Sequence, residues 1–145
     1  VGFGKACELA GAEVESEAKR LKQMRDGLLS NLNDNLSGLS VNGGMNHRVP
    51  GNLNVSLEGV DAESLMAALP DLAFSSGSAC SSASAEASYV LKAIGTSTDL
   101  AESSLRIGLG RFTLEEEVAY AANRLIEEIR NIRKNRQFLS VNAAE

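Results

Sequence analysis

The longest regular pattern in the sequence is a run of helix-forming residues from Ala6 to Leu36. Apolar side chains recur along this run at roughly helical spacing, and charged residues occupy many positions between them. The apolar positions are Ala10, Val14, Leu21, Leu28 and Leu32. The pattern predicts one long helix with an apolar face and a solvated face, or two helices that break near Gly11.

The segments that follow alternate between short strand patterns and helix patterns. Strands are expected at residues 39–41, 53–57, 72–75 and 104–109. Helices are expected at 62–69 with Asp61 as the cap, at 88–94, and from the capping-box sequence at Thr113 to about Arg133. This order predicts an α+β fold in which helices cover one face of a small, mostly antiparallel sheet.

The 145 residues are enough for one compact domain and short for two. We divide the chain into a long leading helix at 1–36, a small domain at 37–134, and an irregular tail at 135–145, where no clear pattern is visible. The chain has no initiator Met, and its first residues already have the pattern of a helix interior. We interpret this opening as a sign that the sequence is part of a larger protein.

The charge balance and the apolar pattern exclude two classes of partner. Lys and Arg total 14 against 19 Asp and Glu, which gives a formal net charge of −5. Nucleic-acid binders normally carry a basic surface, so no nucleic-acid partner is expected. No apolar run approaches the ~20 residues of a membrane helix, and the N-terminus does not resemble a signal peptide, so no membrane association is expected.

The metal-ligating and disulfide-forming residues are few. The sequence has two cysteines, Cys7 and Cys80, and one histidine, His47. A zinc site of about four Cys and His ligands cannot be assembled from them within one chain. A disulfide framework is equally unsupported, which favours a reducing compartment: the cytoplasm, or the mitochondrion in a eukaryote. We expect Cys7 to lie in the core and His47 on the surface.

The candidate nucleophile is Cys80, which lies in a run of Ser, Gly and Ala after a short strand pattern. Such a run has few packing groups and could carry a partly exposed thiol to a reaction site. The alternative is a small buried side chain beneath a loop, since free cysteine is among the most buried residue types. No histidine lies near it in the sequence, so a Cys–His protease pair has no local support.

The candidate anion-binding residue is Arg106, which alternates with Leu105 and Ile107 in a strand pattern. Its side chain is therefore expected on the face opposite the apolar residues, where a guanidinium could hold a carboxylate by two hydrogen bonds. The alternative is a solvated arginine on an open sheet face. Arg111 has the same two interpretations.

Several motifs together resemble one known family. Residues 75–84 read S-S-G-S-A-C-S-S-A-S, which resembles the active-site cysteine loop S-S-G-S-A-C-T-S-A-S of cysteine desulfurases of the NifS/IscS-like, housekeeping iron–sulfur-assembly type. Residues 88–95 (S-Y-V-L-K-A-I-G) and 103–113 (S-S-L-R-I-G-L-G-R-F-T) resemble two further motifs of that family. The resemblance runs from residue 1 to about Arg133, whereas Gln137 to Glu145 do not match the family.

The resemblance implies a fold and a set of roles. The fold would be the C-terminal domain of a fold-type I pyridoxal-phosphate-dependent transferase. Cys80 would attack the sulfur of L-cysteine held on pyridoxal 5'-phosphate, giving L-alanine and a persulfide on Cys80, and Arg106 would hold the substrate carboxylate. The partners would be a sulfur acceptor or iron–sulfur scaffold protein and a second subunit of a homodimer.

The sequence lacks the motif that binds the cofactor in that family. The family's cofactor-binding lysine lies in an S-x-H-K type motif, and this chain has no His-Lys pair. We therefore expect the cofactor to be bound by a domain outside this chain and the chain alone to be inactive. The alternative is a non-catalytic module that presents Cys80 as a persulfide relay. A selenocysteine lyase or a desulfurase of the other major group is disfavoured by the loop sequence.

Overall fold

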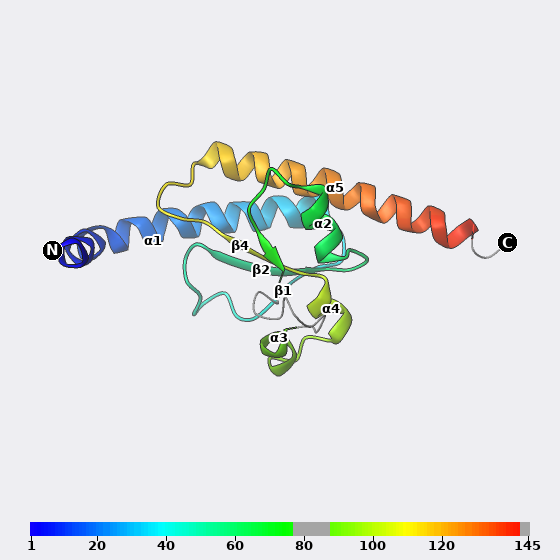
Figure 1. Cartoon of the computed structure of the whole chain (residues 1–145), viewed down its shortest axis with the longest axis horizontal. Helices are drawn as coiled ribbons and strands as arrows, with labels where there is room; N and C mark the ends of the chain where they lie inside the picture. The colour runs from blue at the N-terminus through cyan, green and yellow to red at the C-terminus, as the bar shows by residue number, and fades with distance from the viewer. Residues whose placement is uncertain (77–87, 143–145) are drawn as a thin grey trace.

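A computed structural model describes residues 1–76 and 88–142 of the chain and contains a four-stranded antiparallel sheet (Figure 1). The strand order is β1-β2-β4-β3, and every neighbouring pair is antiparallel. The elements are α1 (Gly2–Asn35), β1 (Leu39–Val41), β2 (Asn52–Leu57), α2 (Ala62–Ala68), β3 (Ser75–Ser76), α3 (Tyr89–Ala93), α4 (Thr98–Glu102), β4 (Ser104–Gly108) and α5 (Glu115–Asn142). The predicted α+β class with a small antiparallel sheet is confirmed.

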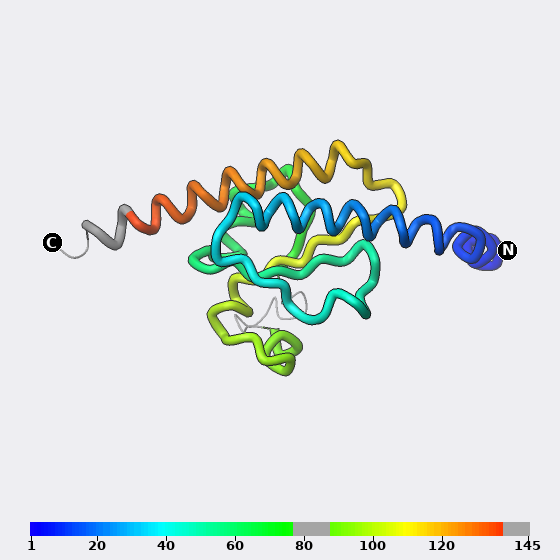
Figure 2. The backbone as a smooth tube through the Cα atoms, turned by 180° about the vertical axis from the view of Figure 1, so that it is seen from behind, coloured from blue at the N-terminus to red at the C-terminus, as the bar shows by residue number. Residues whose placement is uncertain are grey.

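The helices lie in two groups, one on each side of the sheet. Helices α1 and α5 run side by side in the same direction across one side, and α2 lies next to α5 (Figures 1 and 2). The shorter helices α3 and α4 lie on the other side (Figure 1). The N-terminal end of α1 and the last described residues of α5 lie at opposite ends of the molecule (Figure 2).

The core fills the space between the sheet and the two long helices. Alternate residues of β2 and β4 face the helices, namely Leu53, Val55, Leu57, Leu105 and Ile107. The helices contribute apolar residues at helical spacing, among them Leu28, Leu32, Leu125 and Ile129. The apolar residues that alternate in the strands therefore pack against those that recur at helical spacing, and together they form one aliphatic layer, as the pattern predicted.

Removal of a side chain from this layer should have a large effect on stability. Leu53 is 0% exposed at the centre of the sheet, so Leu53→Ala removes apolar contacts and leaves a cavity. We expect the free energy of unfolding to fall by about 2–5 kcal/mol, measured by urea denaturation of the chain. The control is Leu114→Ala at a side chain that is 51% exposed, where we expect a change within about 0.5 kcal/mol. Equal effects would contradict this description of the core.

The first half of α1 differs from its predicted role in the core. The helix is continuous through Gly11, and Leu21, Leu28 and Leu32 are buried as the pattern predicted. Ala10 and Val14 are exposed, however. The prediction that Cys7 lies in the core is wrong, since its side chain is exposed. The reason is that this end of α1 extends beyond the sheet, so no described element covers its apolar face (Figure 1).

Two short elements also differ from the sequence prediction. Helix α4 was not predicted, although Ser97 caps it by accepting a hydrogen bond from the Leu100 N–H group. Its five residues are too few to show a helical period. A strand was expected at 72–75, but the observed strand β3 is Ser75–Ser76, and Leu72 and Phe74 pack against the core from the irregular chain before it.

Helix α5 is longer than predicted. It also begins one residue later than expected, because the capping residue is Leu114 and not Thr113. The Glu117 carboxylate accepts from the Leu114 N–H group at 2.9 Å, whereas the Thr113 hydroxyl accepts from the Gly110 N–H group. The helix continues to Asn142, so the irregular tail expected from residue 135 is wrong up to that point. Residues 135–142 contain neither Gly nor Pro, so nothing in them ends a helix that is already formed.

Candidate functional site

The side of the sheet away from the core is lined by polar residues of β2 and β4. We call it the polar face and define it by the cross-strand pairs Asn52–Gly108, Asn54–Arg106 and Ser56–Ser104. Cross-strand partners share a face, and successive residues alternate between faces. The apolar partners of the same strands are in the core, so these six residues lie on the opposite side.

Helix α4 closes one end of the polar face. The Ser56 hydroxyl donates to the Leu100 carbonyl at 2.6 Å, and the Ser104 hydroxyl donates to the Ala101 carbonyl at 2.7 Å. Both serines are 0% exposed. The next pair along the strands, Asn54 and Arg106, is not closed in this way, because Asn54 is half-buried and Arg106 is exposed.

Arg106 occupies the open part of this face, as its alternation with Leu105 and Ile107 predicted. It is the only charged residue in the four described strands. Within residues 1–76 and 88–142, its side chain has no hydrogen-bond or ion-pair partner. A guanidinium with five donors, none of them used by a described residue, can bind a carboxylate or a phosphate by two parallel hydrogen bonds.

The register that places Arg106 opposite Asn54 is fixed by a close backbone contact. The Leu109 N–H group donates to the Gly51 carbonyl at 2.7 Å, just before β2 begins. A Cβ atom on Gly51 would collide with the Leu109 carbonyl, so only glycine fits there. At Gly108, by contrast, an added Cβ would meet no described atom within 4 Å, so no described residue covers the face at that position.

Arg111, the second predicted clamp, is engaged within the protein. Its guanidinium contacts the Glu13 carboxylate at 2.5 Å and the Glu17 carboxylate at 3.1 Å, both on α1. The hydrogen bond to Glu17 and the charge of Glu13 raise the pKa of Arg111 above its usual value. Arg111 therefore fastens the loop before α5 to α1, and its donors are directed away from the polar face.

Arg48 adds a second positive charge near the polar face. Its guanidinium donates to the Asn42 carbonyl, to the Gly44 carbonyl at 3.2 Å and to the Asn52 side chain at 3.2 Å. Burial and the charge of Arg25 lower the pKa of Arg48, but an arginine remains protonated at neutral pH. The described strands β2, β3 and β4 contain no acidic residue, so Arg106 and Arg48 place two positive charges at this side of the described structure.

Three polar residues at this site were not identified from the sequence. Asn42 is buried and donates from Nδ2 to Asn54 Oδ1 and to Ser56 Oγ, both at 2.8 Å. The alternation of residues 53–57 placed Asn54 and Ser56 away from the core, and that was the only available signal. Their relation to Asn42 and Arg106 depends on strand order and register, which local periodicity does not give.

Cys80 lies outside the described residues, so its predicted exposure is not tested. The attachment of its segment is described, however. Ser75 pairs with Arg106, and Ser76 pairs with Leu105. The last described residue before the cysteine segment is therefore one position past the residue that pairs with Arg106.

The described residues do not fit pyridoxal phosphate. That cofactor is held by a lysine that forms a Schiff base, with an acidic or arginine partner for its ring nitrogen. All five lysines of the chain are exposed on helices, at Lys5, Lys19, Lys22, Lys92 and Lys134. In the described part of the chain, no three His, Cys, Asp or Glu residues form a group suitable for a metal ion.

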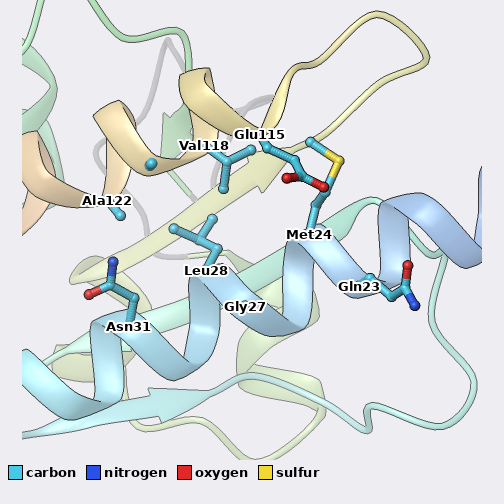
Figure 3. Close-up of a pocket in the computed structure, with 9 residues that line it drawn as sticks. Gln23, Met24, Gly27, Leu28, Asn31, Glu115, Val118 and Ala122 are labelled. Atoms are coloured by element: carbon cyan, nitrogen blue, oxygen red, sulfur yellow. The ribbon is translucent and has the colours of Figure 1, made fainter.

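An open groove of about 290 Å³ lies between α1 and α5, on the helix side of the sheet (Figure 3). Met24 and Leu28 line it from α1, and Val118 and Ala122 line it from α5. Glu115 is the only ionisable residue in its lining. The groove is a gap between two packed helices, and it contains none of the predicted site residues.

Comparison with known proteins finds cysteine desulfurases by sequence and NifS-like proteins by structure. The chain is 55% identical over 134 residues to "Cysteine desulfurase IscS" of Anaeromyxobacter sp. (strain Fw109-5). It is 50% identical over 134 residues to "Cysteine desulfurase" of Mus musculus. The chain belongs to the cysteine desulfurase family. The matched region covers 92% of this chain but only 33% and 29% of these relatives.

The fold agrees with the cysteine desulfurase assignment. A NifS-like protein from Rickettsia africae superposes with a TM-score of 0.75, 22% identity and coverage of 90% of this chain and 33% of that structure. At this identity the likeness concerns the fold alone. No family model matches the chain. In the described residues, no helix combines the length and apolar character needed to cross a membrane.

Proposed function

We propose that this chain is the part of a cysteine desulfurase that orients L-cysteine and receives its sulfur. Arg106 binds the carboxylate of L-cysteine, and Cys80 accepts the sulfur as a persulfide. The observation that carries the proposal is the pairing of Ser75 with Arg106. It joins the start of the cysteine segment to an exposed arginine that no described residue engages.

The segment between Ser76 and Cys80 is short enough for Cys80 and Arg106 to act on one small substrate. Four residue steps separate Ser76 from Cys80. An extended chain covers at most about 3.5 Å per residue, so four steps from Ser76 span at most about 14 Å. A segment of small residues can present a thiol to a substrate held at Arg106 and then to a separate acceptor.

The proposed transfer divides the work between this chain and the rest of the enzyme. The Cys80 thiolate forms a bond to the sulfur of L-cysteine, and the carbon–sulfur bond breaks to leave L-alanine after protonation. The bond-breaking step needs an acceptor for the electron pair, a role that the family resemblance assigns to pyridoxal phosphate. Because the described lysines do not fit that cofactor, we place it outside this chain, which alone is inactive.

The remaining partners follow from the same proposal. The persulfide on Cys80 passes to a sulfur acceptor such as an iron–sulfur scaffold protein, and the whole enzyme is a homodimer. The sequence has two cysteines and no disulfide framework, so we place the enzyme in a reducing compartment, the cytoplasm, or the mitochondrion in a eukaryote.

A chimaeric enzyme tests the proposal. This chain replaces the matching third of the Anaeromyxobacter relative, and its binding of pyridoxal phosphate shows that the product has assembled. We expect it to form alanine from L-cysteine and to release sulfide when a reductant is present. An assembled, cofactor-bearing chimaera that forms neither product contradicts the proposal and favours a non-catalytic persulfide-relay module.

A further inference from the structure

We infer that Asn54 is a second carboxylate-binding residue, which donates from its amide Nδ2 to the carboxylate that Arg106 holds. This inference rests on the proposed function, and it adds a specificity-determining contact to it. Two features support it: the juxtaposition of the two side chains, and a hydrogen-bond chain that fixes the orientation of the Asn54 amide.

The strand register places Asn54 and Arg106 as close as two side chains on neighbouring strands can be. The Leu57 N–H group donates to the Ser103 carbonyl, and the Leu109 N–H group donates to the Gly51 carbonyl. Hydrogen-bonded and non-hydrogen-bonded pairs alternate along an antiparallel ladder. Counting between these two bonds makes Asn54–Arg106 a non-hydrogen-bonded pair, whose Cα atoms are typically about 4.5 Å apart.

The orientation of the Asn54 amide follows from a hydrogen-bond chain that begins at a backbone carbonyl. The Leu100 carbonyl can only accept, so Ser56 uses its one hydroxyl proton in the 2.6 Å bond to it. Ser56 must then accept from Asn42 Nδ2 at 2.8 Å. The second proton on Asn42 Nδ2 is donated to Asn54 Oδ1, also at 2.8 Å.

This chain leaves one group of Asn54 for a ligand. Its Oδ1 accepts from Asn42, so its Nδ2 remains as a donor, and no described residue accepts from it. Asn54 is half-buried beside an exposed Arg106. A carboxylate has about four acceptor positions and can take two hydrogen bonds from a guanidinium and another from an amide. Asn42 therefore acts as a positioning residue through Asn54.

The test uses the chimaeric enzyme with two competitive inhibitors that differ at the carboxylate. L-Alanine retains the carboxylate, and ethylamine lacks it. We expect Asn54→Ala to weaken inhibition by L-alanine about 10-fold, as for loss of a hydrogen bond to a charged group, and to leave inhibition by ethylamine unchanged. Asn54→Asp should weaken inhibition by L-alanine further, because the new carboxylate repels the carboxylate of the inhibitor. Asn42→Ala should have a smaller effect of the same kind, and no effect when Asn54 is already alanine.

The matched control is Asn131→Ala, because Asn131 is exposed on α5 and donates to Glu128. It should change neither inhibition constant. An Asn54→Ala variant that weakens both inhibitors equally, or neither, overturns the inference. If Arg106→Ala still weakens inhibition by L-alanine and leaves inhibition by ethylamine unchanged, the proposed function survives that result.

A second measurement uses the 145-residue chain itself. Side-chain NMR signals of Asn54 and Arg106 are followed during titration with sodium acetate, with ethylammonium chloride as the control salt. We expect both side chains to shift with acetate only. A shift of Arg106 without Asn54 overturns the inference alone, and a shift of neither overturns the Arg106 site as well.

Discussion

Cys80→Ser in the chimaeric enzyme is expected to abolish the formation of alanine and persulfide while cofactor binding stays intact. A serine hydroxyl lacks the acidity and the nucleophilicity of a thiol, so it cannot accept sulfur from L-cysteine. The rate of alanine formation should fall by at least about 1,000-fold, as for loss of a nucleophile. Alanine release is measured in steady state, and the cofactor is followed by its visible absorbance.

The matched control is Cys7→Ser. Cys7 is the other cysteine of the chain, and it is exposed on α1. It lies on the part of α1 that extends away from the sheet (Figure 1). This variant should retain the activity of the unchanged chimaera. Desulfurase activity that survives in Cys80→Ser removes Cys80 from its proposed role.

Arg106→Ala is expected mainly to raise the KM for L-cysteine. The loss of a paired, charge-assisted hydrogen bond is worth about 2–3 kcal/mol, which corresponds to an increase of about 30- to 150-fold. Arg106→Lys should recover part of the affinity, because lysine retains the charge but lacks the planar fork. The measurement is the dependence of alanine formation on L-cysteine concentration in the chimaeric enzyme.

A suitable control is Arg136→Ala, which removes an exposed arginine of α5 far along the chain from the strands. Its KM should equal that of the unchanged chimaera. If Arg106→Ala also leaves the KM unchanged, Arg106 is the solvated arginine that the sequence allowed as the alternative.

The strongly periodic parts of the fold could be predicted from the sequence. Alternation placed Leu53, Val55 and Leu57 in the core and Arg106 on the opposite face, because side-chain direction in a strand has a period of two. The cap of α2 was equally clear, since the Asp61 carboxylate accepts from the Ser64 N–H group as such caps do. In these cases local pattern and tertiary packing agree.

The remaining differences concern features that depend on distant parts of the chain. Val14 continues the apolar face of α1 but is 58% exposed, because burial depends on what lies opposite. Asn42 and Ser56 look like ordinary polar residues in the sequence, and only the strand order β1-β2-β4 connects them to Asn54, the residue that pairs with Arg106. The role proposed for Arg106 comes from the family resemblance. Its neighbour Asn54 is known only from the register of β2 and β4.

In the proposed function, Cys80 receives the sulfur of L-cysteine while Arg106 holds the carboxylate of the same substrate. The most direct measurement is mass spectrometry of the peptide that contains Cys80, after one turnover of the chimaeric enzyme with heavy-sulfur-labelled L-cysteine. We expect one added heavy sulfur atom on that peptide, which is lost on reduction. An unlabelled Cys80 peptide, with equivalent alanine released and the label on another residue, would contradict the proposed function.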